Sequence, residues 1–208
     1  MRAARSQIGL MSKRFISETL ILVVCLCLWG LPAIAADDPQ TVIQTGTEQI
    51  IKILHEQPQE TRARRDQIRE VVYGYVDFEA ISRLAVGAQW RNLSPEKQQE
   101  FTQEFSKLLF NTYVGDIEKY ARQNITYRHR QIYQGYVVVN ALVGGQSIDY
   151  YLHLKDGKWK AYDVGVGGTS LVTNYRNQFD PILTNGSFDR LSMVLKQKID
   201  QVCALDRC

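Results

Sequence analysis

The stretch WKAYDVGVGGTSLVTNYRNQF, residues 159–179, decides how the rest of the chain is interpreted. Residues 157–166 alternate between apolar and polar side chains well enough for a β-strand. The three glycines of this stretch allow a sharp turn, and Ser170 stands where a helix N-cap is expected. The sequence therefore predicts that a strand turns directly into a helix here, so that an apolar strand meets an apolar helix face.

A stripe of apolar side chains marks the helix that follows this corner. Pro181 comes late in the run and predicts a kink or the end of that helix. A final helix is expected over residues 187–202. The stripe of the corner helix consists of Leu171, Tyr175, Ile182 and Leu183, with Val172 and Phe179 beside it.

Four strands are expected in the second half of the chain, at residues 125–134, 136–143, 147–154 and 158–166. The separators Gly144-Gly145 and Asp156-Gly157 are typical of hairpin turns. Strands joined this briefly should form an antiparallel meander. The second strand is apolar on both faces near its middle, so we expect both faces to be covered.

Helical periodicity dominates the chain from residue 40 onward to the first strand. Pro58 separates two helices within residues 40–76, and a short helix is expected from Asp77 to Leu84. Ser94 and Pro95 then form a strong helix start. The long helix that they open, to about residue 122, is apolar over more of its circumference than packing on one sheet face requires.

Four arginines lie at the start of the second helix, namely Arg62, Arg64, Arg65 and Arg69. Such a group could meet acidic headgroups or an acidic partner protein. Acidic residues are interleaved with them at Glu60, Asp66 and Glu70, so we interpret this segment as a solvated helix face.

Together these elements predict an α+β fold. We expect a curved antiparallel four-stranded meander wrapped by N- and C-terminal helices around an apolar pocket. A curved sheet covered by helices readily leaves a cavity with an aromatic and aliphatic lining. The alternative is that every one of these apolar residues is ordinary core.

Residues 1–35 have the order of a secretory signal peptide. Four Lys or Arg residues precede an apolar run from Leu20 to Leu31, and small residues end the segment at Ala33-Ile34-Ala35. The 12-residue run is too short for a membrane span, which needs about twenty residues. Residues 36–208 would then form a single domain. Met11 is an alternative start that gives the leader a more usual length.

The charge of the chain argues against binding to nucleic acid. The leader holds four of the 25 Lys and Arg residues and one of the 22 Asp and Glu residues, so 21 of each sign remain. The net charge without the leader is thus near zero, and the excess of basic residues that is typical of a nucleic-acid binder is missing.

Cys203 and Cys208 remain in a chain bound for an oxidising compartment, so a local disulfide is expected. No histidine lies near the pair, which argues against a metal site.

The sequence contains no strong catalytic or cofactor-binding pattern. Asp163 is the one acid in an apolar strand, and we expect it to accept hydrogen bonds from Arg83 or from backbone groups near the corner. An enzyme would need Asp163, Tyr162 and His153 in one cluster. We therefore predict no catalytic residue, no metal and no cofactor. The three histidines show no metal-ligand spacing: His55, His129 and His153.

Several motifs resemble the periplasmic MlaC family, also called toluene-tolerance auxiliary proteins. The resemblance covers almost the whole chain after the leader. The chain departs from the family at Gly165-Val166-Gly167, where the family has a bulkier turn that usually ends in an acidic residue. The motifs are DFEAISR at residues 77–83, Gly87, Trp90, LSPEKQ at 93–98, YDV at 162–164, and GTSLVTNYR at 168–176 with Gln178-Phe179.

The resemblance implies a periplasmic phospholipid carrier that is not an enzyme. Such carriers shuttle lipid between an outer-membrane lipoprotein complex and an inner-membrane ABC transporter complex, and so maintain outer-membrane lipid asymmetry. Contact with the membrane surface would be transient. The alternatives are a hopanoid-associated lipid carrier of the same family and a ligand-free periplasmic interaction module. On the carrier reading, we expect the pocket to be lined by Leu84, Phe105, Leu109, Tyr113, Val139, Tyr150, Leu152, Val164, Leu171, Tyr175 and Phe179.

Overall fold

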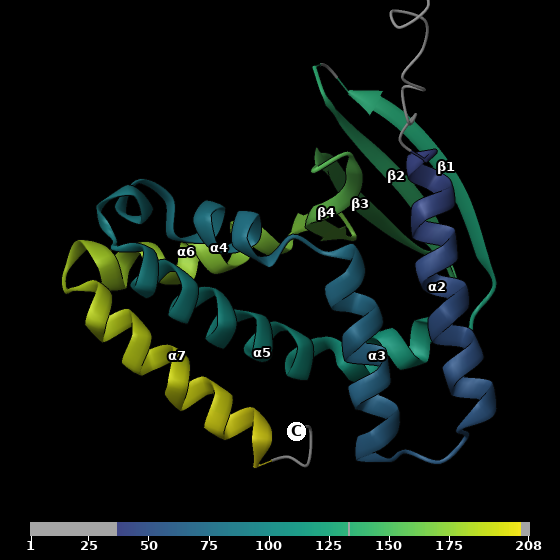
Figure 1. Cartoon of the computed structure of the whole chain (residues 1–208), viewed down its shortest axis with the longest axis horizontal. Helices are drawn as coiled ribbons and strands as arrows, with labels where there is room; N and C mark the ends of the chain where they lie inside the picture. The colour runs from purple at the N-terminus through teal and green to yellow at the C-terminus, as the bar shows by residue number, and fades with distance from the viewer. Residues whose placement is uncertain (1–36, 133, 205–208) are drawn as a thin grey trace, which may run out of the picture. The chain divides into compact units, whose positions relative to one another are not determined.

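The computed structural model describes residues 37–132 and 134–204, without the side chains of residues 129–132. The predicted signal peptide, residues 1–35, and Cys208 lie outside the described residues. The helices and strands are drawn in Figure 1. In chain order they are α2 (Pro39–Glu56), α3 (Arg62–Tyr75), α4 (Phe78–Val86), η1 (Gly87–Asn92), α5 (Pro95–Tyr120), β1 (Ile125–Ile132), β2 (Tyr136–Val143), β3 (Gln146–Lys155), β4 (Lys158–Val166), β5 (Thr169–Ser170), α6 (Leu171–Thr184) and α7 (Phe188–Cys203).

The strands form one antiparallel sheet in the order β1-β2-β3-β4-β5. Each hairpin turn around β3 contains two residues with positive φ. These are Gly144 at 55° and Gly145 at 88°, and Asp156 at 52° and Gly157 at 74°. Two consecutive positive φ angles are what the favoured two-residue hairpin turns require. The predicted α+β class and antiparallel meander are therefore confirmed.

The corner differs from the prediction because a fifth strand precedes the helix. Gly167 and Gly168 have φ angles of 58° and 83°, so they form one more tight turn. The two residues of β5 then pair back onto the end of β4. Helix α6 begins only after this pairing, and the Ser170 hydroxyl accepts its capping hydrogen bond from the Thr173 N–H at 3.0 Å.

A β-bulge interrupts the pairing of β3 with β4. Tyr151 and Leu152 are adjacent on β3, whereas their partners Asp163 and Ala161 are two residues apart on β4. Tyr162 is therefore the extra residue. A bulge of this kind shifts the alternation of side chains between the two faces of the sheet.

Polar side chains define the helix starts as the sequence predicts. The Ser94 hydroxyl accepts from the Lys97 N–H at the start of α5.

Helix α6 does not end at Pro181, but continues to Thr184. A proline this close to the C-terminal end removes one backbone hydrogen bond without breaking the helix.

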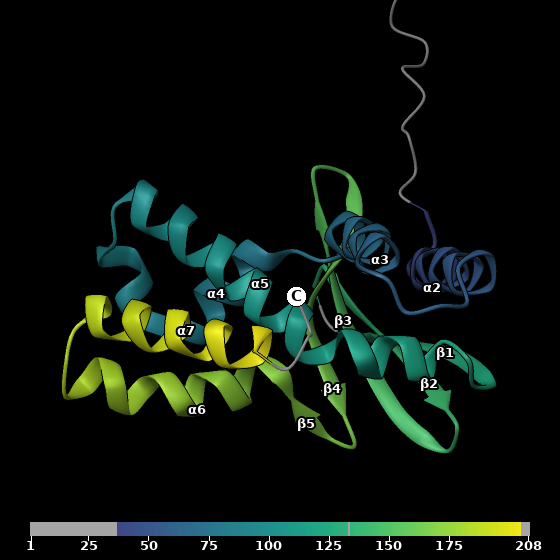
Figure 2. The same cartoon turned by 90° about the horizontal axis from the view of Figure 1, so that it is seen from below.

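The largest buried cluster lies among helices α4, α5, α6 and α7, which pack together in Figures 1 and 2. Phe101 lies at its centre, with ring centroids 5.5 Å from Phe105, 6.0 Å from Phe179 and 5.4 Å from Phe188. A second cluster joins α2, α3 and α5. A third fixes α2 to the sheet and consists of Ile43, Val137, Val139 and Leu152.

Two expectations about exposure are wrong. Leu142 on β2 is 49% exposed, so the outer face of that strand is covered only in part, around Val138. Arg64 is 2% exposed and pairs with Glu118 on α5 at 2.8 Å, instead of lying on a solvated face. A run of charges in the sequence gives no sign of a partner 54 residues away.

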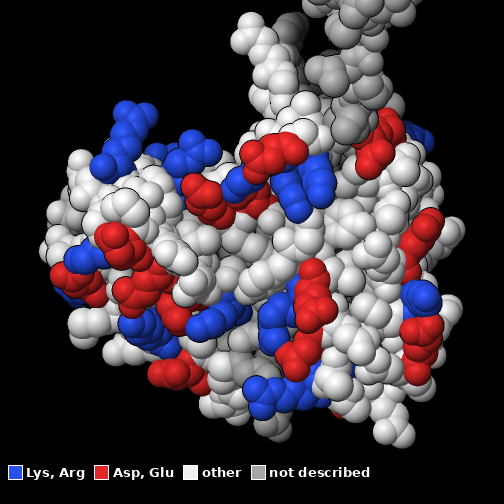
Figure 3. Space-filling model, viewed as in Figure 1, with Lys and Arg blue, Asp and Glu red and all other residues white. Residues whose placement is uncertain are grey.

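The other charges of α3 follow the interleaved pattern. Arg65 pairs with Glu60, and Arg69 pairs with Asp66. On the face seen in Figure 3, basic and acidic side chains are interspersed. Neighbouring charges of opposite sign thus offset one another there.

Candidate functional site

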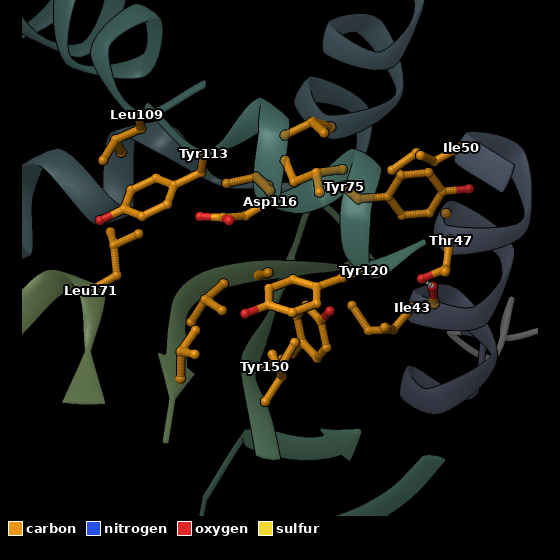
Figure 4. A pocket seen from close by; sticks show the side chains of 18 of the residues that line it. Ile43, Thr47, Ile50, Tyr75, Leu109, Tyr113, Asp116, Tyr120, Tyr150 and Leu171 are labelled. Atoms are coloured by element: carbon orange, nitrogen blue, oxygen red, sulfur yellow. Dashed lines mark hydrogen bonds between the residues drawn. The ribbon is translucent and has the colours of Figure 1, made fainter. Parts of the chain in front are cut away.

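A cavity of about 420 Å³ lies between the sheet and the surrounding helices (Figure 4). This volume is within the range of small-molecule sites, and most of the lining side chains are aliphatic or aromatic. From α2 to α4 the lining residues are Ile43, Gly46, Thr47, Ile50, Val71, Val72, Tyr75, Val76, Phe78 and Ile81. From α5 and the segment after it they are Leu109, Phe110, Tyr113, Asp116, Ile117, Tyr120 and Ala121. The strands and α6 add Ile125, Val143, Ile148, Tyr150, Ala161, Val164, Val166, Thr169, Ser170, Leu171 and Asn174.

The bulge in β4 builds the sheet side of the cavity. Ala161 and Val164 are three residues apart, so on a regular strand they would point to opposite faces. Because Tyr162 is the extra residue between them, both side chains line the cavity. Tyr150 on β3 lies opposite Val164 and lines the same space. Burial, with the Tyr127 phenol nearby, raises the pKa of Tyr150, so its hydroxyl stays neutral at physiological pH.

One face of α5 forms the opposite side. Tyr113, Asp116 and Tyr120 are spaced by three and four residues, which places them on one face of the helix. Figure 4 shows all three directed into the cavity. Among the described residues that line the cavity, Asp116 is the only one with a charged side chain.

Helices α2 and α3 close one end of the cavity through a close approach at Gly46. A Cβ atom at this position would lie 3.1 Å from the Tyr75 ring, so the small residue makes room for that ring. The Gln49 side-chain amide donates to the Tyr75 hydroxyl at 3.2 Å. The Tyr75 ring is thus held in place at the cavity.

Asp77 fixes the segment between α3 and α4 against β4. Its backbone N–H donates to the Ala161 carbonyl at 2.8 Å, beside a bridge between Val76 and Ala161. Its carboxylate accepts from the Lys155 ammonium at 3.0 Å and lies 3.0 Å from His153 Nε2. Burial alone would raise the pKa of Asp77, but the Ala80 N–H, Lys155 and His153 together hold it below the ordinary value.

Asp163 has the structural position that the sequence suggested. Its carboxylate accepts from the Val164 N–H at 2.8 Å, from the Val172 N–H at 3.0 Å and from the Ser170 hydroxyl. The donors are therefore the backbone and the capping serine of the corner, and not Arg83. This side chain joins the end of β4 to the start of α6.

The polar groups of Asp163 and His153, which an enzyme would need in one cluster, are bound to different partners. The carboxylate of Asp163 is bound at the corner, whereas His153 pairs with Asp77. Tyr162 contacts the His153 ring, with centroids 5.1 Å apart. Within the described part of the chain, no group of three or more His, Cys, Asp or Glu side chains could hold a metal ion.

The structure brings five of the eleven predicted pocket residues together around the cavity. They are Leu109, Tyr113, Tyr150, Val164 and Leu171. They come from α5, from strands β3 and β4, and from the first residue of α6. Whether they contact a lipid stays a prediction.

The other six predicted residues do not line this cavity. The helical core contains Phe105, Tyr175 and Phe179 as buried members, with Leu84 packed against it. Val139 and Leu152 are fully buried beneath α2. The sequence pattern identifies an apolar face but does not show whether that face meets a helix or an open space.

Sequence reasoning missed the contribution of α2 and α3, which includes Ile43, Ile50 and Tyr75. Their apolar periodicity is visible in the sequence, yet nothing local shows which part of the sheet they cover. It also missed Asp116, because one acid on an amphipathic helix is normally assigned to the solvent side. The disulfide between Cys203 and Cys208 stays a prediction, because Cys208 is outside the described residues.

None of the helices within residues 37–132 and 134–204 combines the length and the apolar character needed to cross a membrane.

Comparison with known proteins places the chain among relatives of similar length. A curated relative, "Toluene tolerance protein ttg2D" of Pseudomonas putida, is 26% identical over 80% of this chain and 83% of its own. The "Intermembrane phospholipid transport system binding protein MlaC" of Haemophilus influenzae is 21% identical over 88% of this chain and 92% of its own. These relatives match this chain over most of their length.

A solved structure has the same fold. The phospholipid-binding protein from Ralstonia solanacearum, determined in complex with a phospholipid, superposes with a TM-score of 0.72 and is 26% identical. The match covers 80% of this chain and 99% of that one. The family model described as "MlaC protein" matches residues 44–197, which include all of the residues that line the cavity except Ile43. The chain belongs to the MlaC family.

Proposed function

We propose that this chain binds a phospholipid in the cavity and carries it without changing it chemically. The observation that carries this proposal is an apolar cavity of about 420 Å³ in a member of the MlaC family. The Ralstonia solanacearum relative, which was solved with a phospholipid bound, supports the choice of ligand. The five predicted residues that line the cavity would contact the lipid.

The energetics favour a carrier over a tight binder. Hiding one methylene group from water is favourable by about 0.8 kcal/mol, so acyl chains enter a dry cavity readily. A bilayer hides the same groups equally well, and the net free energy of exchange is therefore near zero. Small differences in affinity at each docking site would then decide where the lipid is released.

We further propose that residues 1–35 are a signal peptide, that residues 36–208 form one lipid-binding domain, and that this domain works in the periplasm. There it would exchange lipid with an outer-membrane lipoprotein complex and an inner-membrane ABC transporter complex, and so maintain outer-membrane lipid asymmetry. The support is the order of residues in the leader and the name of the Haemophilus influenzae relative, an intermembrane phospholipid transport system binding protein.

Transfer between vesicles tests the proposal. Donor vesicles with an acyl-labelled phospholipid are mixed with unlabelled acceptor vesicles, and the label is followed as the protein concentration is raised. The proposal predicts a transfer rate that rises with protein concentration, and a phospholipid that mass spectrometry recovers unchanged. A rate equal to that without protein would contradict carriage, and a cleaved phospholipid would contradict the absence of catalysis.

A further inference from the structure

We propose that the cavity selects a lipid whose headgroup carries an ammonium group, as in phosphatidylethanolamine, over a lipid with an anionic headgroup. Asp116, flanked by Tyr113, would be the residue that makes this choice. The inference rests on the proposed phospholipid binding and adds to it the chemical class of the headgroup.

The charge of the lining favours an ammonium headgroup. Sites built for a phosphate or another anion use Arg or Lys, because their N–H groups match the oxygen atoms of the anion. Among the described lining residues there is no Arg, Lys or His, and the one charged side chain is the carboxylate of Asp116. An anionic headgroup would bring a second negative charge to this carboxylate, whereas an ammonium group would neutralise it.

The position of Asp116 along α5 suits a headgroup that meets water. Leu109, seven residues earlier on the same face, is only 5% exposed, whereas Asp116 is exposed to solvent. The lining becomes apolar again after Asp116, and Ala121 just past the end of α5 is only 8% exposed. Asp116 is thus a solvent-exposed carboxylate between two apolar parts of the lining. A headgroup at Asp116 would stay in contact with water while the acyl chains lie against the apolar side chains.

Aromatic side chains flank the Asp116 carboxylate on α5. Tyr113 and Tyr120 lie one turn before and one turn after Asp116, and aromatic faces attract ammonium groups. The Lys119 ammonium already lies 5.9 Å from the centroid of the Tyr120 ring, which shows that this ring accepts a cation. The ring of Tyr113 and the carboxylate of Asp116 then remain for the headgroup.

A competition between two lipids tests the inference. The delipidated protein is incubated at low salt with vesicles of equimolar phosphatidylethanolamine and phosphatidylglycerol that share the same acyl chains. The protein is then separated, and both lipids are quantified by mass spectrometry. Wild type should be enriched in phosphatidylethanolamine by about three- to fivefold, the selectivity that an exposed charge pair supports. Raising the salt concentration should lower this ratio.

Variants isolate the carboxylate. Asp116→Asn should bring the ratio close to that of the vesicles, and Asp116→Lys should reverse it. Asp180→Asn is the matched control, since Asp180 is an exposed acid on α6 that is not among the lining residues, and it should keep the wild-type ratio. Equal ratios in wild type and both Asp116 variants, with lipid bound, would overturn the inference alone. Failure of every protein to take up either lipid would overturn the proposed phospholipid binding itself.

Discussion

At the scale of a single residue, the Asp77 carboxylate both caps a helix and binds two side chains of the sheet. It caps α4 through the Ala80 N–H at 3.1 Å, and it holds Lys155 and His153 of β3. Its side chain is 4% exposed, so these interactions are only weakly screened by water. Because Asp77 lies next to two residues that line the cavity, Val76 and Phe78, its position also fixes one side of that cavity.

A pH dependence follows from the lowered pKa of Asp77. A carboxyl group with a folded-state pKa below its unfolded value of 3.8 stabilises the fold above that pH, and loses this contribution as the pH falls through the folded value. Asn also caps helices well, so Asp77→Asn should remove mainly the charge, at a cost of about 1 kcal/mol near neutral pH. Urea unfolding of both proteins should show the difference in unfolding free energy shrinking below about pH 4. A difference that stays constant down to pH 3 or so would contradict this role.

Two glycines with opposite environments give a second prediction at this scale. Gly87 has φ 71° and ψ −138°, a combination that side chains strongly disfavour. Gly87→Ala should therefore lower the free energy of unfolding by about 2 kcal/mol, even if the Arg176 guanidinium beside it moves away. Gly115 lies within α5 and faces open space, so Gly115→Ala should raise the same free energy by up to about 1 kcal/mol. Denaturant midpoints that shift in the same direction would be inconsistent with this account.

At the scale of elements, α5 has a wide apolar surface because it contacts both the helical core and the cavity. Phe101, Phe105 and Leu108 pack in the helical core, whereas Tyr113, Ile117 and Tyr120 line the cavity. One helix thus serves two environments along its length. The sequence correctly predicts the wide surface, but periodicity alone does not divide it between a packed core and a cavity.

The elements themselves are largely predictable, because their signals are local. The turn residues Gly144-Gly145 and Asp156-Gly157 and the capping residues Ser94 and Ser170 act within a few positions of their own place in the chain. The strand β5 was missed because its two residues leave no periodicity to detect. The bulge at Tyr162 was missed because it depends on the partner strand, and the burial of Arg64 because its partner is far away in the sequence.

Arg64 ties three elements together. Its guanidinium on α3 donates to Glu118 on α5 and to the carbonyl oxygens of Gln57 and Pro58, at 3.3 and 3.1 Å, before α3. Arg64→Ala should therefore lower the free energy of unfolding by about 3–5 kcal/mol, because Glu118 is left buried without its partner. The exposed pair of Lys52 and Glu56 is the control.

Glu56→Gln should change the urea midpoint very little, since exposed ion pairs contribute little. Arg64→Lys should not restore stability, because a single ammonium cannot reach the carboxylate and both carbonyl oxygens as the guanidinium does. An Arg64→Ala midpoint equal to that of the control would show that the buried pair does not hold α3 against α5.

At the scale of the whole molecule, the cavity depends on parts of the chain that are far apart in sequence. Ile43 and Ile50 from α2 face the same space as Val164 from β4. The existence of an apolar pocket was predicted, and so were five of its lining residues. The remainder could not be predicted because it depends on how α2 and α3 dock on the sheet, which is a long-range property.

Filling the cavity should separate binding from folding. Val164→Trp places a larger ring into the cavity, so bound lipid should fall several-fold while the thermal midpoint changes little. Leu109 lines the opposite side but is also buried in the helical core, so Leu109→Trp should lower the thermal midpoint as well as the bound lipid. Val139 is fully buried beneath α2, so Val139→Trp should instead overpack the core and lower stability by about 1–3 kcal/mol. Normal lipid content in both cavity variants would mean that the lipid does not bind here.

The most direct test of the account is native mass spectrometry of the mature protein, purified from the periplasm without detergent. Solvent extraction and lipid analysis of the same sample would identify any bound molecule. The account predicts a mass that exceeds that of the chain by one phospholipid, and extraction should return that phospholipid. An apo mass that persists after incubation with phospholipid vesicles would contradict it, and the cavity would then need another occupant or none.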